Sequence, residues 1–166
     1  MWIEISVSAL SGFCSKLSDQ ASERKIYLPP LLPYLSSIIY GVGLSYLAIS
    51  GELSALYIAL AISAVLAGKI DHKYHIAGLV AFVLPLIIFP IQKFDIWIFS
   101  LFLVLSLLDE LNLSLGNFVK FLSSQRFFTP IGALMIFIFG GPSIFLISIL
   151  SFDIAYRISA YIFRKQ

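Results

Sequence analysis

The chain is a succession of long apolar segments separated by short polar ones. Within each apolar segment the hydrophobic residues are nearly continuous and do not alternate with polar residues, which favours helices over the strands of a membrane barrel. Most of these segments reach or approach the roughly 17–25 apolar residues that a helix needs to cross a bilayer. The sequence predicts six membrane spans, at residues 31–50, 53–70, 75–91, 96–113, 127–139 and 143–163.

Two further segments have a mixed character. Residues 2–14 are apolar but include Glu4 and several small polar residues, and residues 15–25 continue them as a polar helical end. We predict a short or partly inserted helix there, with a seventh span as the alternative. The acidic start is not typical of a signal peptide. Residues 117–125 combine apolar and polar positions in the pattern of a short helix lying on the membrane surface.

Composition agrees with this picture. The chain has 166 residues, of which 60% are hydrophobic, and a mean hydropathy of +0.98, far outside the range of soluble domains. We therefore predict one all-α domain, a polytopic membrane bundle spanning residues 1–166. One cysteine, Cys14, excludes an intrachain disulfide and a metal site built from several cysteines. Phosphate-loop and dinucleotide patterns are absent, and we expect no nucleic-acid partner.

The basic residues predict the orientation. Of the eleven, ten fall on the side where residues 31–50 begin, and Lys93 falls on the other. Since basic residues accumulate on the cytoplasmic side of membrane proteins, we predict a multi-pass protein of the cell membrane with a cytoplasmic C-terminus. The ten residues are Lys16, Arg24, Lys25, Lys69, Lys73, Lys120, Arg126, Arg157, Arg164 and Lys165.

The most polar stretch, residues 66–75 (LAGKIDHKYH), connects the second and third predicted spans. Asp71 and His75 share a helical face if the connection is helical, and lie at one cytoplasmic turn if it is not. Carboxylates and imidazoles can hold a divalent cation or exchange protons, so both are candidate functional residues. The alternative is that the stretch is a solvated loop, and this is the assignment that we expect for Lys73.

Ionisable residues also occur inside two predicted spans, where each costs about 2.5–3.5 kcal/mol or more. Asp153 lies near the middle of the last span, and Arg157 follows one helical turn later. They could form a local ion pair, or an acid at the base of a pocket beside a cation ready for an anion. Asp109 and Glu110 lie near the end of the fourth span. Because adjacent helical residues point about 100° apart, we expect one of them, Asp109, to face the pocket.

Separated buried charges need partners, so we expect the connection at residues 66–75 to meet the cytoplasmic ends of the fourth and sixth spans. The leading hypothesis is an enzyme that acts at this face on a phosphorylated or diphosphate lipid. Its candidate catalytic residues are Asp71, His75 and Asp153. Its candidate phosphate-binding residues are Lys16, Lys69, Arg126 and Arg157. A divalent cation, magnesium, would be held by Asp71, Asp109 and Asp153.

Two other hypotheses stay open. The first is a carrier of small solutes or a carrier coupled to ions, in which a second copy of the chain supplies the missing half of the path. The second is a non-catalytic membrane subunit or assembly factor whose charges only set the topology and form ion pairs. In all three hypotheses the lipid bilayer is the first partner of the chain.

Overall fold

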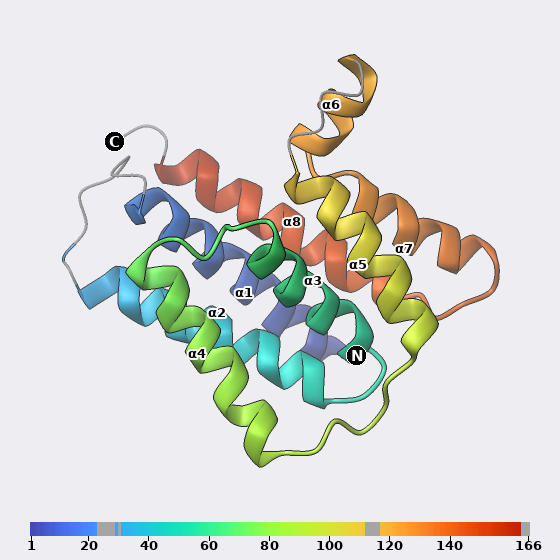
Figure 1. The fold of residues 1–166 in the computed structure, drawn as a ribbon, viewed down its shortest axis with the longest axis horizontal. Coiled ribbons are helices and arrows are strands. Elements are labelled where there is room, and N and C mark those ends of the chain that lie inside the picture. The colour runs from blue at the N-terminus through green and yellow to red at the C-terminus, as the bar shows by residue number, and fades with distance from the viewer. Residues whose placement is uncertain (23–28, 30, 112–116, 164–166) are drawn as a thin grey trace.

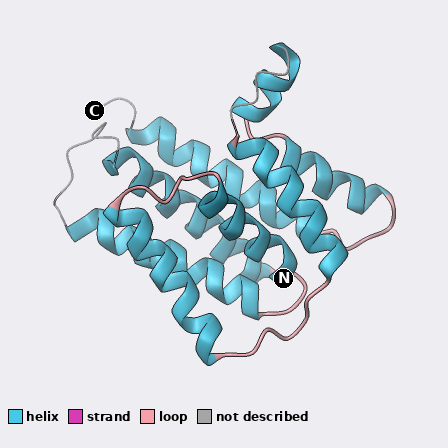
Figure 2. Cartoon of the chain, viewed as in Figure 1, coloured by secondary structure: helices cyan, strands magenta, loops and turns pink. Residues whose placement is uncertain are grey.

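The structure is a computed structural model that describes residues 1–22, 29, 31–111 and 117–163, without the side chains of residues 117, 118, 120 and 124. Within these residues the chain forms eight helices and no strand (Figures 1 and 2). The predicted all-α class is therefore confirmed. The basic residues predicted to set the topology at positions 24, 25, 164 and 165 lie outside the described residues. The helices are α1 (Trp2–Ser22), α2 (Leu31–Ile49), α3 (Ser54–Leu66), α4 (Lys73–Ile88), α5 (Ile96–Glu110), α6 (Asn117–Ser124), α7 (Phe128–Ile138) and α8 (Ile144–Phe163).

Each predicted span corresponds to one helix. Helix α4 begins two residues before its predicted span, and the other five helices lie within theirs, most of them ending short of the apolar segment. Helix α3 ends at Leu66 because Gly68 adopts a positive φ of 69°, a conformation that glycine tolerates and that ends helices. Helix α4 begins only at Lys73. Residues 67–72 therefore form a loop, and Asp71 lies on this loop and not on a helix.

Two helices, α2 and α8, are long and apolar enough to cross a membrane by length and composition. Helices α3, α4 and α7 are apolar but have 13, 16 and 11 residues. The six-span arrangement therefore stays a prediction from the sequence. The N-terminal segment is a single helix of 21 residues, longer than its apolar stretch.

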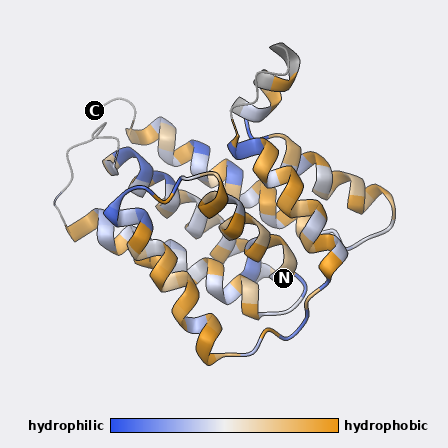
Figure 3. Ribbon diagram, viewed as in Figure 1, coloured by the Kyte–Doolittle hydropathy of each residue, from blue (hydrophilic) through white to orange (hydrophobic). Residues whose placement is uncertain are grey.

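The helices pack with apolar side chains outward and small polar ones inward. Large apolar side chains are exposed along the whole bundle, among them Trp97 (82% exposed), Phe139 (81%) and Ile87 (75%). Figure 3 shows that hydrophobic residues occur along most of the helices. Serines, by contrast, lie inside. The fully buried ones include Ser8, Ser18, Ser36, Ser37, Ser45, Ser54, Ser148 and Ser159.

Helix α1 lies between α2 and α8, α4 packs on α2, and α3 packs on α5, which also contacts α7. Small residues permit close approach: a Cβ atom added to Gly12 would lie 2.2 Å from the carbonyl oxygen of Phe152, so α1 and α8 meet backbone to backbone there. The hydroxyl of Tyr57 lies 2.7 Å from Ser148 Oγ and 2.5 Å from Ser8 Oγ, and these bonds link α1, α3 and α8.

Candidate functional site

A cavity of about 490 Å³ opens at one end of the bundle. We call this end, where α1, α3, α5 and α8 finish and α2, α4 and α7 begin, the charged end, and the opposite one the far end (Figure 1). The cavity is lined by residues of α1, α2, α3, α4, α5, α7 and α8, by the loop at residues 67–72, and by Arg126 before α7. It therefore collects side chains from Ser15 to Tyr156, 141 positions apart in the sequence.

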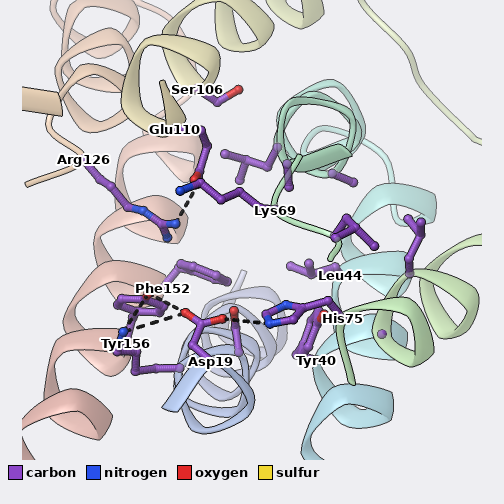
Figure 4. A pocket seen from close by; sticks show the side chains of 18 of the residues that line it. Asp19, Tyr40, Leu44, Lys69, His75, Ser106, Glu110, Arg126, Phe152 and Tyr156 are labelled. Atoms are coloured by element: carbon purple, nitrogen blue, oxygen red, sulfur yellow. Dashed lines mark hydrogen bonds and ion pairs between the residues drawn. The ribbon is translucent and has the colours of Figure 1, made fainter. Parts of the chain in front are cut away.

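Asp19 of α1 is the centre of a polar cluster in the cavity (Figure 4). The Tyr156 hydroxyl donates a hydrogen bond of 2.6 Å to Asp19 Oδ2. Lys16 Nζ lies 3.8 Å from the same oxygen and donates to the Tyr156 hydroxyl at 3.2 Å. On its other side, Asp19 Oδ1 lies 3.8 Å from His75 Nε2. One carboxylate thus holds groups from α1, α4 and α8 in fixed positions.

His75 of α4 is oriented by this cluster. Its Nε2 atom lies 3.2 Å from Ser22 Oγ, and the Ser22 hydroxyl itself donates to the carbonyl of Asp19 at 2.8 Å. Ser22 is thus an acceptor for His75, which assigns the proton of the neutral imidazole to Nε2. Nδ1 then carries the lone pair and has no hydrogen-bond partner among the described residues. Since Ser22 and Asp19 face the same nitrogen, this is not a serine–histidine–aspartate relay, in which they occupy opposite nitrogens.

Arg126 enters the cavity from the segment between α6 and α7. Its Nη2 atom lies 2.7 Å from Glu110 Oε1, and its guanidinium stacks 5.1 Å from the centre of the Tyr156 ring. Burial opposes the charged form, but Glu110 and the more distant acids prevail and raise the pKa of Arg126 above its usual value. Lys16 lies 4.7 Å from the centre of the same ring. Tyr156 therefore contacts two cations.

The backbone of Arg126 has a φ of 55°, the only positive value recorded for a described residue other than glycine. This left-handed conformation costs a non-glycine residue about 1–2 kcal/mol. Such strain often marks functional positions, because the rest of the fold must hold the residue in place. The sequence predicted Arg126 as a phosphate-binding residue, and the fold directs its side chain into the cavity.

Asp109 of α5 has a different role from the one predicted. Oδ1 accepts a hydrogen bond from the Phe128 amide at 2.9 Å, and Oδ2 accepts from the amide and hydroxyl of Thr129 at 2.8 and 2.7 Å. Asp109 therefore caps the N-terminus of α7 from a neighbouring helix, satisfying amides that lack helical partners. Both oxygens are engaged, so we assign Asp109 to the scaffold.

Asp153 of α8 lies in the same cavity but makes no hydrogen bond or ion pair within the described part of the chain. The suggested pair with Arg157 does not form. Instead, Arg157 donates to the side-chain and backbone oxygens of Gln125 at 3.1 and 2.7 Å, lies over the Phe127 ring, and is exposed outside the cavity. The structure thus separates Asp153, which faces the cavity, from Arg157, which does not.

The loop at residues 67–72 forms one wall of the cavity with Lys69, Asp71 and His72. Figure 4 shows Lys69 extending toward Glu110 and Arg126. Lys73 lies outside the cavity, over the rings of Tyr34 and Tyr74, consistent with its assignment to a solvated surface.

The predicted magnesium ligands do not form a metal site. Within the described residues, no three histidine, cysteine, aspartate or glutamate side chains are arranged to hold one ion together. Asp109 is occupied by amides, as described above.

No protein-family model, curated protein or solved structure matches this chain. Its function has to be inferred from the site itself.

The base of the cavity is apolar. Phe82 and Ile149 line it and belong to the buried core that continues toward the far end through Tyr57, Phe102 and Phe145. At the far end, the ionisable groups are dispersed. Lys93 and Glu52 form an exposed pair at 3.8 Å, and Asp95 caps α5 through the amides of Trp97 and Ile98.

Three residues of the site, Asp19, Ser22 and Tyr156, were absent from the candidates drawn from the sequence. Glu110 was weighed there against Asp109, and the structure places both in the lining of the cavity. Two spacings carried a signal. Lys16 and Asp19 are three residues apart, as are Asp153 and Tyr156, so each pair shares a helical face. What the spacing could not show is that the two faces meet.

Proposed function

We propose that the chain is a polytopic membrane protein whose cavity, on the cytoplasmic side, binds the phosphorylated headgroup of a lipid and catalyses a reaction at that phosphate. The observation that carries the proposal is the meeting of Lys16, Lys69 and Arg126 with the unpaired Asp153 and the oriented His75 in one cavity. Lysine and arginine provide the charge and donors that phosphate oxygens require.

Membrane insertion is supported by the surface. A soluble protein rarely exposes apolar patches beyond a few hundred Å², whereas here they cover most helices. The serine-rich interior is typical of helices that pack within lipid. Trp2 and Trp97, both strongly exposed, lie at the far end, where tryptophan suits the membrane interface. Helices shorter than the hydrocarbon thickness are accommodated by local thinning of the bilayer.

In the proposed mechanism, His75 accepts a proton at Nδ1 from the water or alcohol whose oxygen bonds to the phosphorus atom. The bond from phosphorus to the leaving oxygen of the lipid breaks, and the imidazolium returns the proton to that oxygen. Asp19 and Ser22 hold the imidazole in the required tautomer. Lys69 and Arg126 offset the negative charge that develops on the phosphate oxygens. Asp153 contacts polar atoms of the substrate beside the phosphate, because no protein group occupies its oxygens.

The one-sided arrangement distinguishes this proposal from a carrier. A carrier needs a polar path that reaches both faces of the membrane, but the apolar core closes the cavity toward the far end. A non-catalytic subunit would not need a histidine held by two partners in a cavity of a size typical of small-molecule sites.

Binding is tested with purified protein in detergent and dioleoyl phosphatidic acid, with phosphatidylcholine as the reference lipid. We expect Arg126→Gln to weaken binding of phosphatidic acid at least tenfold. Arg157→Gln, which changes the same residue type outside the cavity, should alter the affinity less than twofold. Equal effects of the two variants, or equal binding of both lipids, would refute the headgroup site.

Catalysis is tested by release of inorganic phosphate, or transfer of the phosphoryl group, from phosphatidic acid and from a diphosphate lipid. His75→Ala should lower the rate at least a hundredfold while leaving lipid binding within threefold, because His75 acts on the attacking group. Binding without any turnover of either lipid would favour the non-catalytic alternative.

Topology is tested with single cysteines at Lys73 and Glu52 in a Cys14→Ser background. On intact cells, an impermeant maleimide should label the cysteine at position 52 and leave the one at position 73 unlabelled. The opposite labelling would place the cavity on the outer side of the membrane.

A further inference from the structure

Helix α4 is attached to the bundle mainly through α2, with a smaller contact to α1 at His75. It packs closely against α2, where a Cβ added to Gly41 would lie 2.2 Å from the carbonyl oxygen of Gly78. It has almost no contact with α3 or α5, although only the loop at residues 67–72 separates α3 from α4 in the sequence. Two consecutive antiparallel helices would ordinarily pack together, so the separation of α3 and α4 is a specific feature of this fold.

Part of the cavity lies between these two helices. Helix α3 contributes Leu60, Ala61 and Ala64 to its lining, and α4 contributes Leu79 and Phe82. The small side chains of the two alanines leave space that leucines would fill. We call this part of the cavity, between α3 and α4 and below the loop at residues 67–72, the lateral gap.

The outer surfaces of the two helices, outside the gap, are also apolar. On α3, Ile62 and Val65 are 37% and 45% exposed, and on α4, Ile76 and Val83 are 51% and 39% exposed. The charged residues of the cavity lie above, on the loop at residues 67–72 and around Arg126. The gap thus offers polar contacts at the level of lipid headgroups and apolar contacts at the level of lipid chains.

The volume of the cavity decides how a lipid could bind. About 490 Å³ is enough for a ligand of drug-like size. A phospholipid with two long chains does not fit inside, so most of its hydrocarbon must remain in the bilayer while the headgroup is bound. An opening directed toward the lipid chains is therefore needed in addition to an opening to water.

We propose that the lateral gap is the entry by which an anionic lipid of the surrounding leaflet reaches the site, with one hydrocarbon chain lying between α3 and α4. The phosphate then lies near Lys69 and Arg126, and the chain passes over Ala61 and Ala64. This inference rests on the proposed function for the identity of the headgroup. The existence of the gap is inferred only from the packing of α4. The lateral entry and the headgroup site can therefore fail separately.

Access of lipid chains to the gap is measured by quenching of tryptophan fluorescence with phosphatidylcholine brominated on its chains. In a Trp2→Phe, Trp97→Phe background, a single tryptophan is placed at Leu79 in the gap, at Val83 on the outer surface, or at the buried Phe102. Quenching of Leu79→Trp should reach at least half of that of Val83→Trp, while Phe102→Trp stays unquenched. A second reporter, Leu60→Trp on the opposite wall, should behave like Leu79→Trp.

Occupancy by substrate is measured in the same vesicles. Unbrominated dioleoyl phosphatidic acid should lower the quenching of Leu79→Trp at least twofold and leave that of Val83→Trp unchanged. Inorganic phosphate should have no such effect, because it has no chain to occupy the gap.

A blocking variant provides an independent test. Ala64→Phe should weaken binding of dioleoyl phosphatidic acid at least tenfold and change binding of inorganic phosphate less than twofold. Val65→Phe adds the same bulk one residue away on the exposed surface and should change neither.

The outcomes separate the two ideas. If Leu79→Trp and Leu60→Trp are quenched no more than Phe102→Trp while phosphatidic acid still binds, the lateral entry is wrong and the headgroup site stands. If both are quenched but phosphatidic acid neither binds nor protects them, the gap admits lipid chains and the proposed function is wrong.

Discussion

Asp109 and Asp153 face the same cavity from different helices, and their surroundings are opposite. Asp109 accepts three hydrogen bonds from the start of α7 and uses both of its oxygens. Asp153 accepts none from the described residues, although it lies within the bundle. A carboxylate whose two oxygens are both bonded by the protein has nothing left to offer a ligand, whereas one without protein partners can still accept hydrogen bonds from a ligand. The comparison assigns Asp109 to the scaffold and leaves Asp153 available for the substrate of the proposed function.

The largest expected effect is on the scaffold. Asp109→Ala should lower the free energy of unfolding by roughly 2–4 kcal/mol, because it removes charge-assisted hydrogen bonds and leaves two amides of α7 unsatisfied in the interior. The measurement is a denaturant titration of the purified protein in detergent.

Asp95→Ala is the matched control for Asp109→Ala. Asp95 also caps a helix through two amides, but it is exposed at the far end, where water can replace it. Its loss should cost about 1 kcal/mol or less. If the two variants were equally stable, Asp109 would not be a buried cap that joins α5 to the start of α7.

The second prediction concerns Asp153 and Arg157. Asp153→Leu should leave the melting temperature within a few degrees of the wild type, because no protein group loses a hydrogen-bond partner. It should reduce lipid binding or activity at least tenfold, which corresponds to about 1.4 kcal/mol. Arg157→Met should have little effect on function, because its partners are Gln125 and Phe127.

The double variant, Asp153→Leu with Arg157→Met, completes a mutant cycle. Its effects should be the sum of the two single effects within about 0.5 kcal/mol, as for sites without a shared contact. If Arg157→Met alone were much more destabilising than the double change, the two residues would be strongly coupled. That result would support the interpretation of Asp153 and Arg157 as a buried ion pair.

The sequence was sufficient to locate the helices, because long apolar runs and the prolines and glycines between them are local signals. It also predicted that charges would gather at one end, because helix direction alternates along the chain and basic residues fall at every second connection. It could not distinguish Asp109 from Asp153. The amides that bind Asp109 belong to Phe128 and Thr129, about twenty residues away, and only tertiary packing brings them there.

The same limit explains why Asp19 and Tyr156 were missed. Their hydrogen bond joins residues 137 positions apart, and each looks on its own helix like an ordinary interfacial residue. The contact depends on how closely α1 and α8 approach, which Gly12 permits. No local sequence pattern around either residue predicts this contact.

The smallest predicted effect tests whether Arg126 is held under strain for its contacts in the cavity. Arg126→Gly and Arg126→Ala both remove the ion pair with Glu110 and the contact with Tyr156, so they differ only in the backbone. At a φ of 55°, glycine is unstrained and alanine is not. We therefore expect the glycine variant to be more stable than the alanine variant by about 1 kcal/mol, the reverse of their order in a helix. Both should lose lipid binding equally. If alanine were as stable as glycine, residue 126 would not be strained, and the placement of its side chain would follow from the loop alone.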